Sequence, residues 1–180
     1  NLKVKRGEIL SLLGENGSGK TTLMNMISGI YFPDEGHILV DGKAVSIRSP
    51  KDSFDLGIGM IHQHFKLIDV MTAAENIILG LKGNAVLDMK KVHKDIQELV
   101  DRYGFDLDPA QKVYTMSVSQ KQTVEIVKML YRGANILILD EPTAGLDPKG
   151  RDDILGQIAK LQKERGITIV LVSHSMEDVA

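Results

Sequence analysis

The sequence feature that most constrains this chain is a glycine-rich stretch, residues 14–21, between an apolar run and a helical pattern. It reads Gly-Glu-Asn-Gly-Ser-Gly-Lys-Thr and fits the pattern G-x-x-x-x-G-K-[ST]. Glycines let backbone N–H groups curl around phosphate oxygens, and the following helix points the positive end of its dipole at the same anion. Residues 8–13 have the composition of a buried strand, and residues 20–29 that of a helix. The pattern therefore predicts a strand–loop–helix unit that binds the phosphates of a nucleotide.

Individual residues of this stretch have definable roles at a bound nucleotide. Lys20 is expected to reach the β- and γ-phosphates, and the hydroxyl of Thr21 is suited to bind Mg²⁺. The other positions contribute backbone N–H groups or flank the loop. The residues that we expect to contact the nucleotide are Gly14, Glu15, Asn16, Gly17, Ser18, Gly19, Lys20, Thr21 and Thr22.

Length and composition limit the other possibilities. A chain of 180 residues is the size of one domain, and a net charge of −2 lacks the basic surface that nucleic-acid binding usually needs. The absence of cysteine excludes disulfides and cysteine-based metal sites. Apolar runs such as residues 167–172 are of strand length, far below the ~20 residues of a membrane-spanning helix. Any membrane role is therefore expected to act through a partner.

Alternating apolar runs and helical patterns predict an α/β fold. Continuous apolar runs indicate strands buried on both faces, and hence parallel. Strands are predicted at residues 9–13, 136–139 and 167–172, and helices at residues 89–103, 118–131 and 149–164. A hairpin is predicted over residues 37–47, around the turn Asp41-Gly42. The expected architecture is a parallel core sheet with helices, a small antiparallel edge and a helical subdomain over approximately residues 66–132.

Both ends of the chain are expected to be truncated. Residues 1–5 have the alternation of a strand and include no initiator methionine, and residues 175–180 look like the first turns of a helix. We therefore expect this sequence to be a fragment of a longer protein.

Two carboxylates follow the apolar run at residues 136–139. Asp140 and Glu141 stand where parallel α/β sheets bind ligands, at the carboxyl end of a buried strand. Such a strand could simply run into a charged loop, but the phosphate-binding pattern upstream favours a functional interpretation. Asp140 is suited to hold Mg²⁺, usually through water, and Glu141 to polarise an attacking water molecule.

At these residues the chain resembles the ATP-binding subunits of ABC transporters, over nearly its whole length. Residues 140–147, Asp-Glu-Pro-Thr-Ala-Gly-Leu-Asp, are similar to their Walker B strand and D-loop, and Ser173-His174 to the switch histidine. Gln63 matches their Q-loop glutamine. The resemblance implies a P-loop NTPase fold in which His174 contacts the γ-phosphate and orients Glu141, while Gln63 senses Mg²⁺ and the γ-phosphate. It also implies that residues 65–76 touch a membrane subunit.

The family signature, Leu-Ser-Gly-Gly-Gln, is altered in this chain. The aligned residues 116–120 read Met-Ser-Val-Ser-Gln, so the serine is kept and both glycines are replaced. The resemblance implies that Ser117, Ser119 and Gln120 contact the nucleotide held by a second subunit, and that Asp147, the D-loop aspartate, is a further nucleotide-site residue. Either the N–H of Ser119 still donates to phosphate, or its side chain weakens the half-site that this chain lends to its partner.

Two importer groups share features with different parts of the chain. Residues 57–65, 74–80 and 122–126 are similar to the first ATPase domain of tandem simple-sugar and nucleoside importers. Residues 143–151 and 172–180 are similar to the ATPases of energy-coupling factor vitamin importers. The change falls between Leu137 and Gly145, and a natural recombinant, an assembly artefact and a divergent single family all remain open. His62 and His64 flank Gln63, but two alternating histidines without a third ligand do not predict a metal site.

The resemblance implies an ATPase, with ATP and Mg²⁺ as cofactors, that energises an importer of simple sugars or nucleosides. Its expected partners are a second ABC ATPase domain and transmembrane permease subunits, at the cytoplasmic face of the cell membrane; no nucleic acid is expected. One alternative is an energy-coupling factor ATPase for a vitamin or metal. Others are an ABC ATPase acting on nucleic acid or the ribosome, and a non-catalytic fragment.

Overall fold

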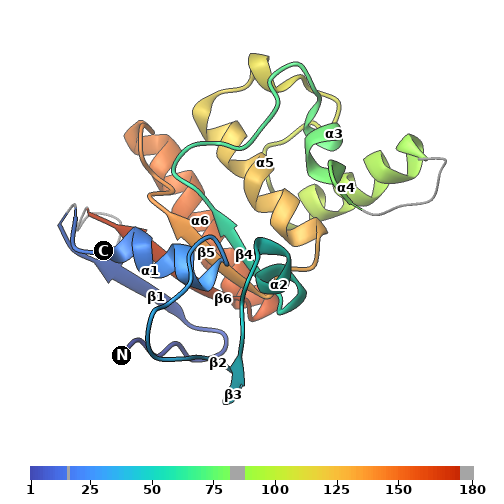
Figure 1. Ribbon diagram of the computed structural model, residues 1–180. Coiled ribbons are helices and arrows are strands. Elements are labelled where there is room, and N and C mark those ends of the chain that lie inside the picture. The colour runs from blue at the N-terminus through green and yellow to red at the C-terminus, as the bar shows by residue number, and fades with distance from the viewer. Residues whose placement is uncertain (16, 82–87, 175–180) are drawn as a thin grey trace.

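The computed structural model describes residues 1–15, 17–81 and 88–174. Its centre is a four-stranded parallel sheet in the order β1-β6-β5-β4 (Figure 1). The strands are β1 (Ile9–Leu13), β4 (Ile58–Ile61), β5 (Ile136–Asp140) and β6 (Thr168–Ser173). The register pairs Leu13 with Ser173 and Asp140 with Val172, so the carboxyl ends of these strands lie together. The predicted α/β class with a parallel core sheet is therefore confirmed.

Alternate residues of the central strands point to opposite faces of the sheet, and each face has its own hydrophobic core. Ile138 and Val170 pack with Met24 of helix α1 (Lys20–Ile27) on one face. Leu137 and Leu139 pack on the other face with helix α6 (Pro148–Arg165) and with the helices that lie between β4 and β5 in the sequence. This two-sided burial explains why the strands read as continuous apolar runs.

The smaller sheet is an antiparallel hairpin of β2 (Ile38–Val40) and β3 (Lys43–Val45). It lies within the predicted range 37–47, although its second strand ends two residues before Ile47. Residues 1–5, predicted to be a strand, have no strand structure. Their alternation fits a strand, but no described strand pairs with them. Helix α2 (Pro50–Asp55), capped by Ser49, follows the hairpin and precedes β4; the sequence analysis did not predict it.

A helical lobe stands beside the sheet, between β4 and β5 in the sequence (Figure 1). It contains α3 (Ala73–Ile78), α4 (Met89–Tyr103), the short 3₁₀ helix η1 (Val113–Thr115) and α5 (Val118–Tyr131). Capping boxes begin two of these helices, Thr72 with Glu75 at α3 and Ser117 with Gln120 at α5. These elements fall inside residues 66–132, where a helical subdomain is predicted; the limits of that subdomain stay a prediction.

Among the described residues, no helix has the length and apolarity that crossing a bilayer requires. The helix predicted over residues 175–180 lies outside the described residues.

Candidate functional site

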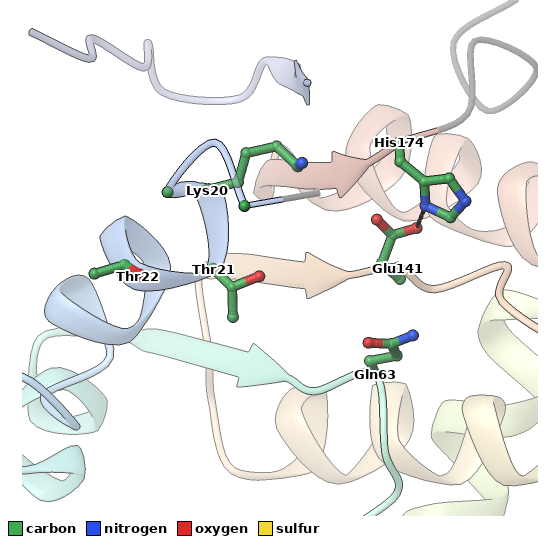
Figure 2. A pocket seen from close by; sticks show the side chains of 8 residues that line it. Lys20, Thr21, Thr22, Gln63, Glu141 and His174 are labelled. Carbon is green, nitrogen blue, oxygen red and sulfur yellow. Dashed lines mark hydrogen bonds and ion pairs between the residues drawn. The ribbon is translucent and has the colours of Figure 1, made fainter. Parts of the chain in front are cut away.

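A cavity of about 350 Å³ opens at the carboxyl ends of the parallel strands. Figure 2 shows that its lining side chains come from α1, from the chain after β4, and from the ends of β5 and β6. The structure thus brings together residues that are distant in sequence and that were each predicted as site residues. The lining residues are Gly17, Gly19, Lys20, Thr21, Thr22, Gln63, Glu141 and His174.

The loop before α1 depends on glycine for its shape. Gly17 and Gly19 have φ of +85° and +88°, a backbone conformation that other residues adopt only at a cost. At Gly14 a Cβ would lie 2.8 Å from the Oγ of Ser18, so a larger residue there would displace the Ser18 side chain. These constraints produce a concave run of backbone suited to an anion. Asn16, predicted to contact the nucleotide, lies outside the described residues.

Lys20 lies across this loop. Its Nζ donates to the carbonyl oxygens of Gly14 at 2.6 Å and of Glu15 at 2.9 Å, and it is 3.5 Å from the Oγ of Ser18. The ammonium group is therefore held against the backbone of the loop. Thr22 also lines the cavity, although Figure 2 shows its side chain directed away from Gln63 and Glu141.

Asp140 and Thr21 form a second group at the same end of the sheet. The Thr21 hydroxyl donates to the Asp140 carboxylate at 3.5 Å, and Asp140 is only 6% exposed. Burial, followed by the charge of neighbouring Glu141, raises the pKa of Asp140. A hydroxyl, a buried carboxylate and the nearby amide of Gln63 are the oxygen donors that a hard divalent cation prefers, so these residues fit Mg²⁺.

Glu141 and His174 are in direct contact. The Nδ1 of His174 lies 2.8 Å from the Oε2 of Glu141, as the dashed line in Figure 2 marks. Glu141 has a φ of +51°, and its backbone N–H donates to the carbonyl of Val172 at 2.9 Å. The Glu141 side chain is 12% exposed and that of His174 is 54% exposed, so the pair bridges the interior and the cavity.

The histidines beside Gln63 have different surroundings. His62 is half-buried, and burial lowers its pKa, whereas His64 is exposed. Gln63 is exposed between them and faces the cavity (Figure 2).

The signature residues and Asp147 line a different cavity, of about 740 Å³, between α5, α6 and the end of α4. Ser117 is the N-cap of α5, and Asp147 is the N-cap of α6, where its side chain accepts from the Gly150 N–H at 3.1 Å. The Cβ of Ser119 lies 3.7 Å from the position that a Cβ on Gly150 would take. This chain therefore does not bring Ser117, Ser119, Gln120 and Asp147 to the cavity of Lys20 and Glu141.

The sequence analysis missed two buried charged residues on α5, Glu125 and Lys128, which are 4% and 9% exposed. Both contact the backbone of Lys66, close to Gln63 in the sequence. The available signal was a pair of opposite charges, three residues apart, within an otherwise apolar part of the helix.

Comparison with known proteins places this geometry in a family. The ABC transporter family model matches residues 1–144. The nucleoside import ATP-binding protein NupA of Lactococcus lactis subsp. cremoris is 49% identical over 181 residues, which cover 99% of this chain and 36% of NupA. The chain thus spans about a third of the length of this curated relative.

Solved structures of ATP-binding cassettes have the same fold. CbiO1 from Clostridium perfringens, part of the ABC transporter complex CbiONQ, superimposes with a TM-score of 0.83 at 34% identity, covering 99% of this chain and 72% of CbiO1. The ATP-binding cassette MJ0796, in a dimeric post-hydrolysis state bound to ADP and Pi, superimposes with a TM-score of 0.80 at 30% identity, covering 99% of this chain and 79% of MJ0796. The glycine-rich loop before α1, the paired carboxylates at the end of β5 and the matched family model together establish that this chain belongs to the ABC transporter family, as an ATP-binding cassette domain with the P-loop ATPase fold.

Proposed function

We propose that this chain is the ATP-hydrolysing domain of an ABC importer. The observation that carries the proposal is the single cavity shared by Lys20, Gln63, Glu141 and His174. It combines a lysine suited to bind phosphate with a carboxylate–imidazole pair suited to orient an attacking water molecule. Family membership and the likeness to MJ0796, whose structure holds ADP and Pi, support the same reaction.

The residues of the cavity have separate roles in hydrolysis. The N–H groups of the loop and the Lys20 ammonium bind the β- and γ-phosphates of ATP, and they stabilise the negative charge of the transferring group. Glu141 accepts a hydrogen bond from the attacking water and orients it for in-line displacement. His174 holds that carboxylate in place through Nδ1, which leaves its other ring nitrogen to contact the γ-phosphate. The bond between the γ-phosphorus and the bridging oxygen breaks as the bond to water oxygen forms.

The metal-binding role falls to Thr21, Asp140 and Gln63. The Thr21 hydroxyl and the amide oxygen of Gln63 would bind Mg²⁺ directly, and the Asp140 carboxylate would hold its water ligands. When bound, Mg²⁺ neutralises charge on the β- and γ-phosphates. Binding of the cation also offsets the unfavourable burial of the Asp140 carboxylate, which has a raised pKa.

A second ABC ATPase domain is proposed as partner. Ser117, Ser119, Gln120 and Asp147 lie in a separate cavity from Lys20 and Glu141, so they cannot act on the same nucleotide within one chain. In a head-to-tail pair, each chain's α5 N-terminus, the positive end of its helix dipole, would face the γ-phosphate held by the other. Permease subunits would join this pair to the cytoplasmic face of the membrane, with residues 65–76 as the contact.

A nucleoside is the proposed cargo, with a simple sugar as the next candidate, because of NupA and the resemblance of residues 57–65, 74–80 and 122–126. An energy-coupling factor importer of a vitamin or metal is the alternative that residues 143–151 favour. ATP-dependent uptake of labelled nucleoside, sugar and vitamin in a strain lacking the gene separates these options. Uptake that is lost in the deletion strain and restored by the gene identifies the cargo.

The test of the reaction uses substitutions in the cavity of the full protein that contains this sequence. Glu141→Gln is expected to keep ATP binding and to lower the hydrolysis rate by at least ~100-fold, because a neutral amide is a far weaker base towards the attacking water than a carboxylate. Lys20→Ala is expected to lose ATP binding itself. Glu98→Gln, which removes an exposed carboxylate on α4, is the control and should leave both properties unchanged. Unchanged hydrolysis in Glu141→Gln would eliminate the proposed role of Glu141.

A further inference from the structure

Helix α5 contains a buried ion pair that the proposed mechanism does not use. The Glu125 and Lys128 side chains are 5% and 11% exposed, and the Lys128 Nζ lies 3.7 Å from the Glu125 Oε2. Burial lowers the pKa of Lys128, and the charge of Glu125 opposes that effect. A buried pair of this kind is often no more stable than two apolar side chains of the same size. Stability alone therefore does not explain why this position holds opposite charges.

Both charged groups are bonded to the backbone of one residue. The Glu125 carboxylate accepts from the Lys66 N–H at 2.8 Å, and the Lys128 ammonium donates to the Lys66 carbonyl at 3.4 Å. Ile68, two residues after Lys66, is bonded in a similar way to the Asn76 side chain. Its N–H donates to the Asn76 amide oxygen at 2.7 Å, and its carbonyl accepts from the Asn76 amide nitrogen at 3.0 Å. Residues 66–68, the anchored segment, are thus fixed to the helical lobe through their backbone.

Gln63 lies in the short connection between the sheet and the anchored segment. Strand β4 ends at Ile61, which is in register with Leu139 of β5. Only residues 62–65 separate Ile61 from Lys66, and four residues span at most ~14 Å when fully extended. Figure 1 shows this part of the chain leaving β4 and crossing to the lobe of α3, α4 and α5. The position of Gln63 is therefore set by one attachment to the sheet and one to α5.

We propose that Glu125, in its pair with Lys128, is a positioning residue that places Gln63 in the nucleotide cavity through the backbone of Lys66. Glu125 itself does not line the cavity. Helix α5 also has Ser117 at its N-terminus, the end proposed to contact the nucleotide of the partner. The bonds between α5 and Lys66 therefore link the position of Gln63 to the helix that contacts the partner's nucleotide. The inference rests on the proposed ATPase function.

Two variants separate positioning from general support of the fold. Glu125→Gln keeps an acceptor for the Lys66 N–H but removes the negative charge that pairs with the Lys128 ammonium group. The double variant Glu125→Leu with Lys128→Met removes both bonds to Lys66 while filling the same space with apolar groups, so it retains the packing of α5. Ile126→Val, fully buried on the same helix, is the matched control, since it weakens packing without touching Lys66.

The first readout is amide hydrogen exchange at Lys66, measured in the full protein without nucleotide. This measurement reports local opening of the anchored segment and requires no hydrolysis. We expect exchange to be about tenfold faster in Glu125→Gln, where the charged acceptor of the Lys66 N–H becomes a neutral one, and faster still in the double variant, where this hydrogen bond is lost. Ile126→Val should exchange at Lys66 as the wild type does.

The second readout is the Mg²⁺ concentration that gives half-maximal ATP hydrolysis. Both Glu125 variants are expected to raise it by about tenfold, the effect typical of removing a group that orients a metal ligand. Gln63→Ala is expected to raise it by at least as much, and adding Glu125→Gln to Gln63→Ala should cause no further change, because both act on one contact. Ile126→Val should leave the Mg²⁺ dependence unchanged.

The outcomes separate this inference from the proposed function. If exchange at Lys66 in the double variant equals that of the wild type, Glu125 does not fix the anchored segment and the inference is wrong, whatever the hydrolysis rate. If exchange increases but the Mg²⁺ dependence stays that of the wild type, Glu125 has only a structural role, and the inference again fails. A wild-type protein that does not hydrolyse ATP refutes the proposed function and with it this inference. Should the double variant not fold, Glu125→Gln alone decides by the same two criteria.

Discussion

Replacing Glu141 by alanine and by glycine separates the conformational strain at this residue from its chemistry. Glu141 has a φ of +51°, in the region that favours glycine. A residue with a Cβ in the left-handed conformation costs about 1–2 kcal/mol. Glycine relieves that cost but loses about 0.5–1 kcal/mol more backbone entropy on folding than alanine does. Because both variants lack the carboxylate and its contact with His174, the difference between them reports only the backbone.

We therefore expect the glycine variant to be more stable than the alanine variant by about 0.5–1 kcal/mol. For a domain of this size the corresponding difference in melting temperature is roughly 2 °C. The assay is thermal and urea unfolding of the two variants side by side, without nucleotide. Both should fail to hydrolyse ATP, so activity should not distinguish them.

Asp41 offers an internal control for this comparison. It is the other described non-glycine residue with positive φ, at +52°, and it lies in the exposed turn of the hairpin. Asp41→Gly should exceed Asp41→Ala in stability by a similar amount, while both keep wild-type hydrolysis. If the Asp41 variants differ as expected, an alanine variant at position 141 that is as stable as the glycine variant would refute the strained conformation of Glu141. If the alanine and glycine variants are equally stable at both positions, the entropy of glycine cancels the strain at both.

Three further perturbations have defined outcomes. Asp140→Asn should raise the melting temperature of the nucleotide- and Mg²⁺-free protein at neutral pH, because burial raises the Asp140 pKa and disfavours its charged form. This gain should shrink as the pH falls towards ~4, where the unfolded carboxyl is also protonated. Gly29→Ala should lower the free energy of unfolding, measured with urea, by more than ~3 kcal/mol, since its Cβ would lie 2.3 Å from the Ser49 carbonyl oxygen. Gly36 is also left-handed but has open space around it, so Gly36→Ala should lower the same free energy by only about 1 kcal/mol. Ser119→Gly should leave ATP binding unchanged and hydrolysis within about threefold of wild type, because the backbone N–H is kept; a change above tenfold in steady-state hydrolysis would assign a role to the side chain.

The parts of the site that sequence alone predicted are those whose chemistry is local. The loop before Lys20 and the carboxylates at the end of β5 each belong to one short segment with a definite residue pattern, so no knowledge of packing was needed. That the two segments lie together followed from the parallel sheet, since parallel strands present their carboxyl ends at one edge. The roles of the individual residues stay predictions until the substitutions are measured.

The elements that sequence did not predict are short or have their pattern interrupted. Strand β4 contains Gly59, which interrupts the apolar run that would otherwise indicate a strand. A Cβ at Gly59 would lie 2.9 Å from the Met129 sulfur, so packing against α5 explains the glycine. Helices α2 and α3 have six residues each, too few to show a helical period. The attachment of Lys66 to Glu125 joins residues 59 positions apart and becomes visible only in the folded chain.

The strain at Glu141 has a geometric reason that links the fold to the proposed chemistry. Consecutive residues of a strand point to opposite faces, so Asp140 and Glu141 could not both serve one cavity if β5 continued through them. Strand β5 ends at Asp140, which contacts Thr21, and the positive φ of the next residue turns the chain so that Glu141 meets His174 at the same edge. The Glu141 N–H still bonds to Val172 of β6, which holds this turn against the sheet. A relaxed backbone at position 141 would therefore be expected to separate the two carboxylates, and the strain is the cost of placing both at one nucleotide.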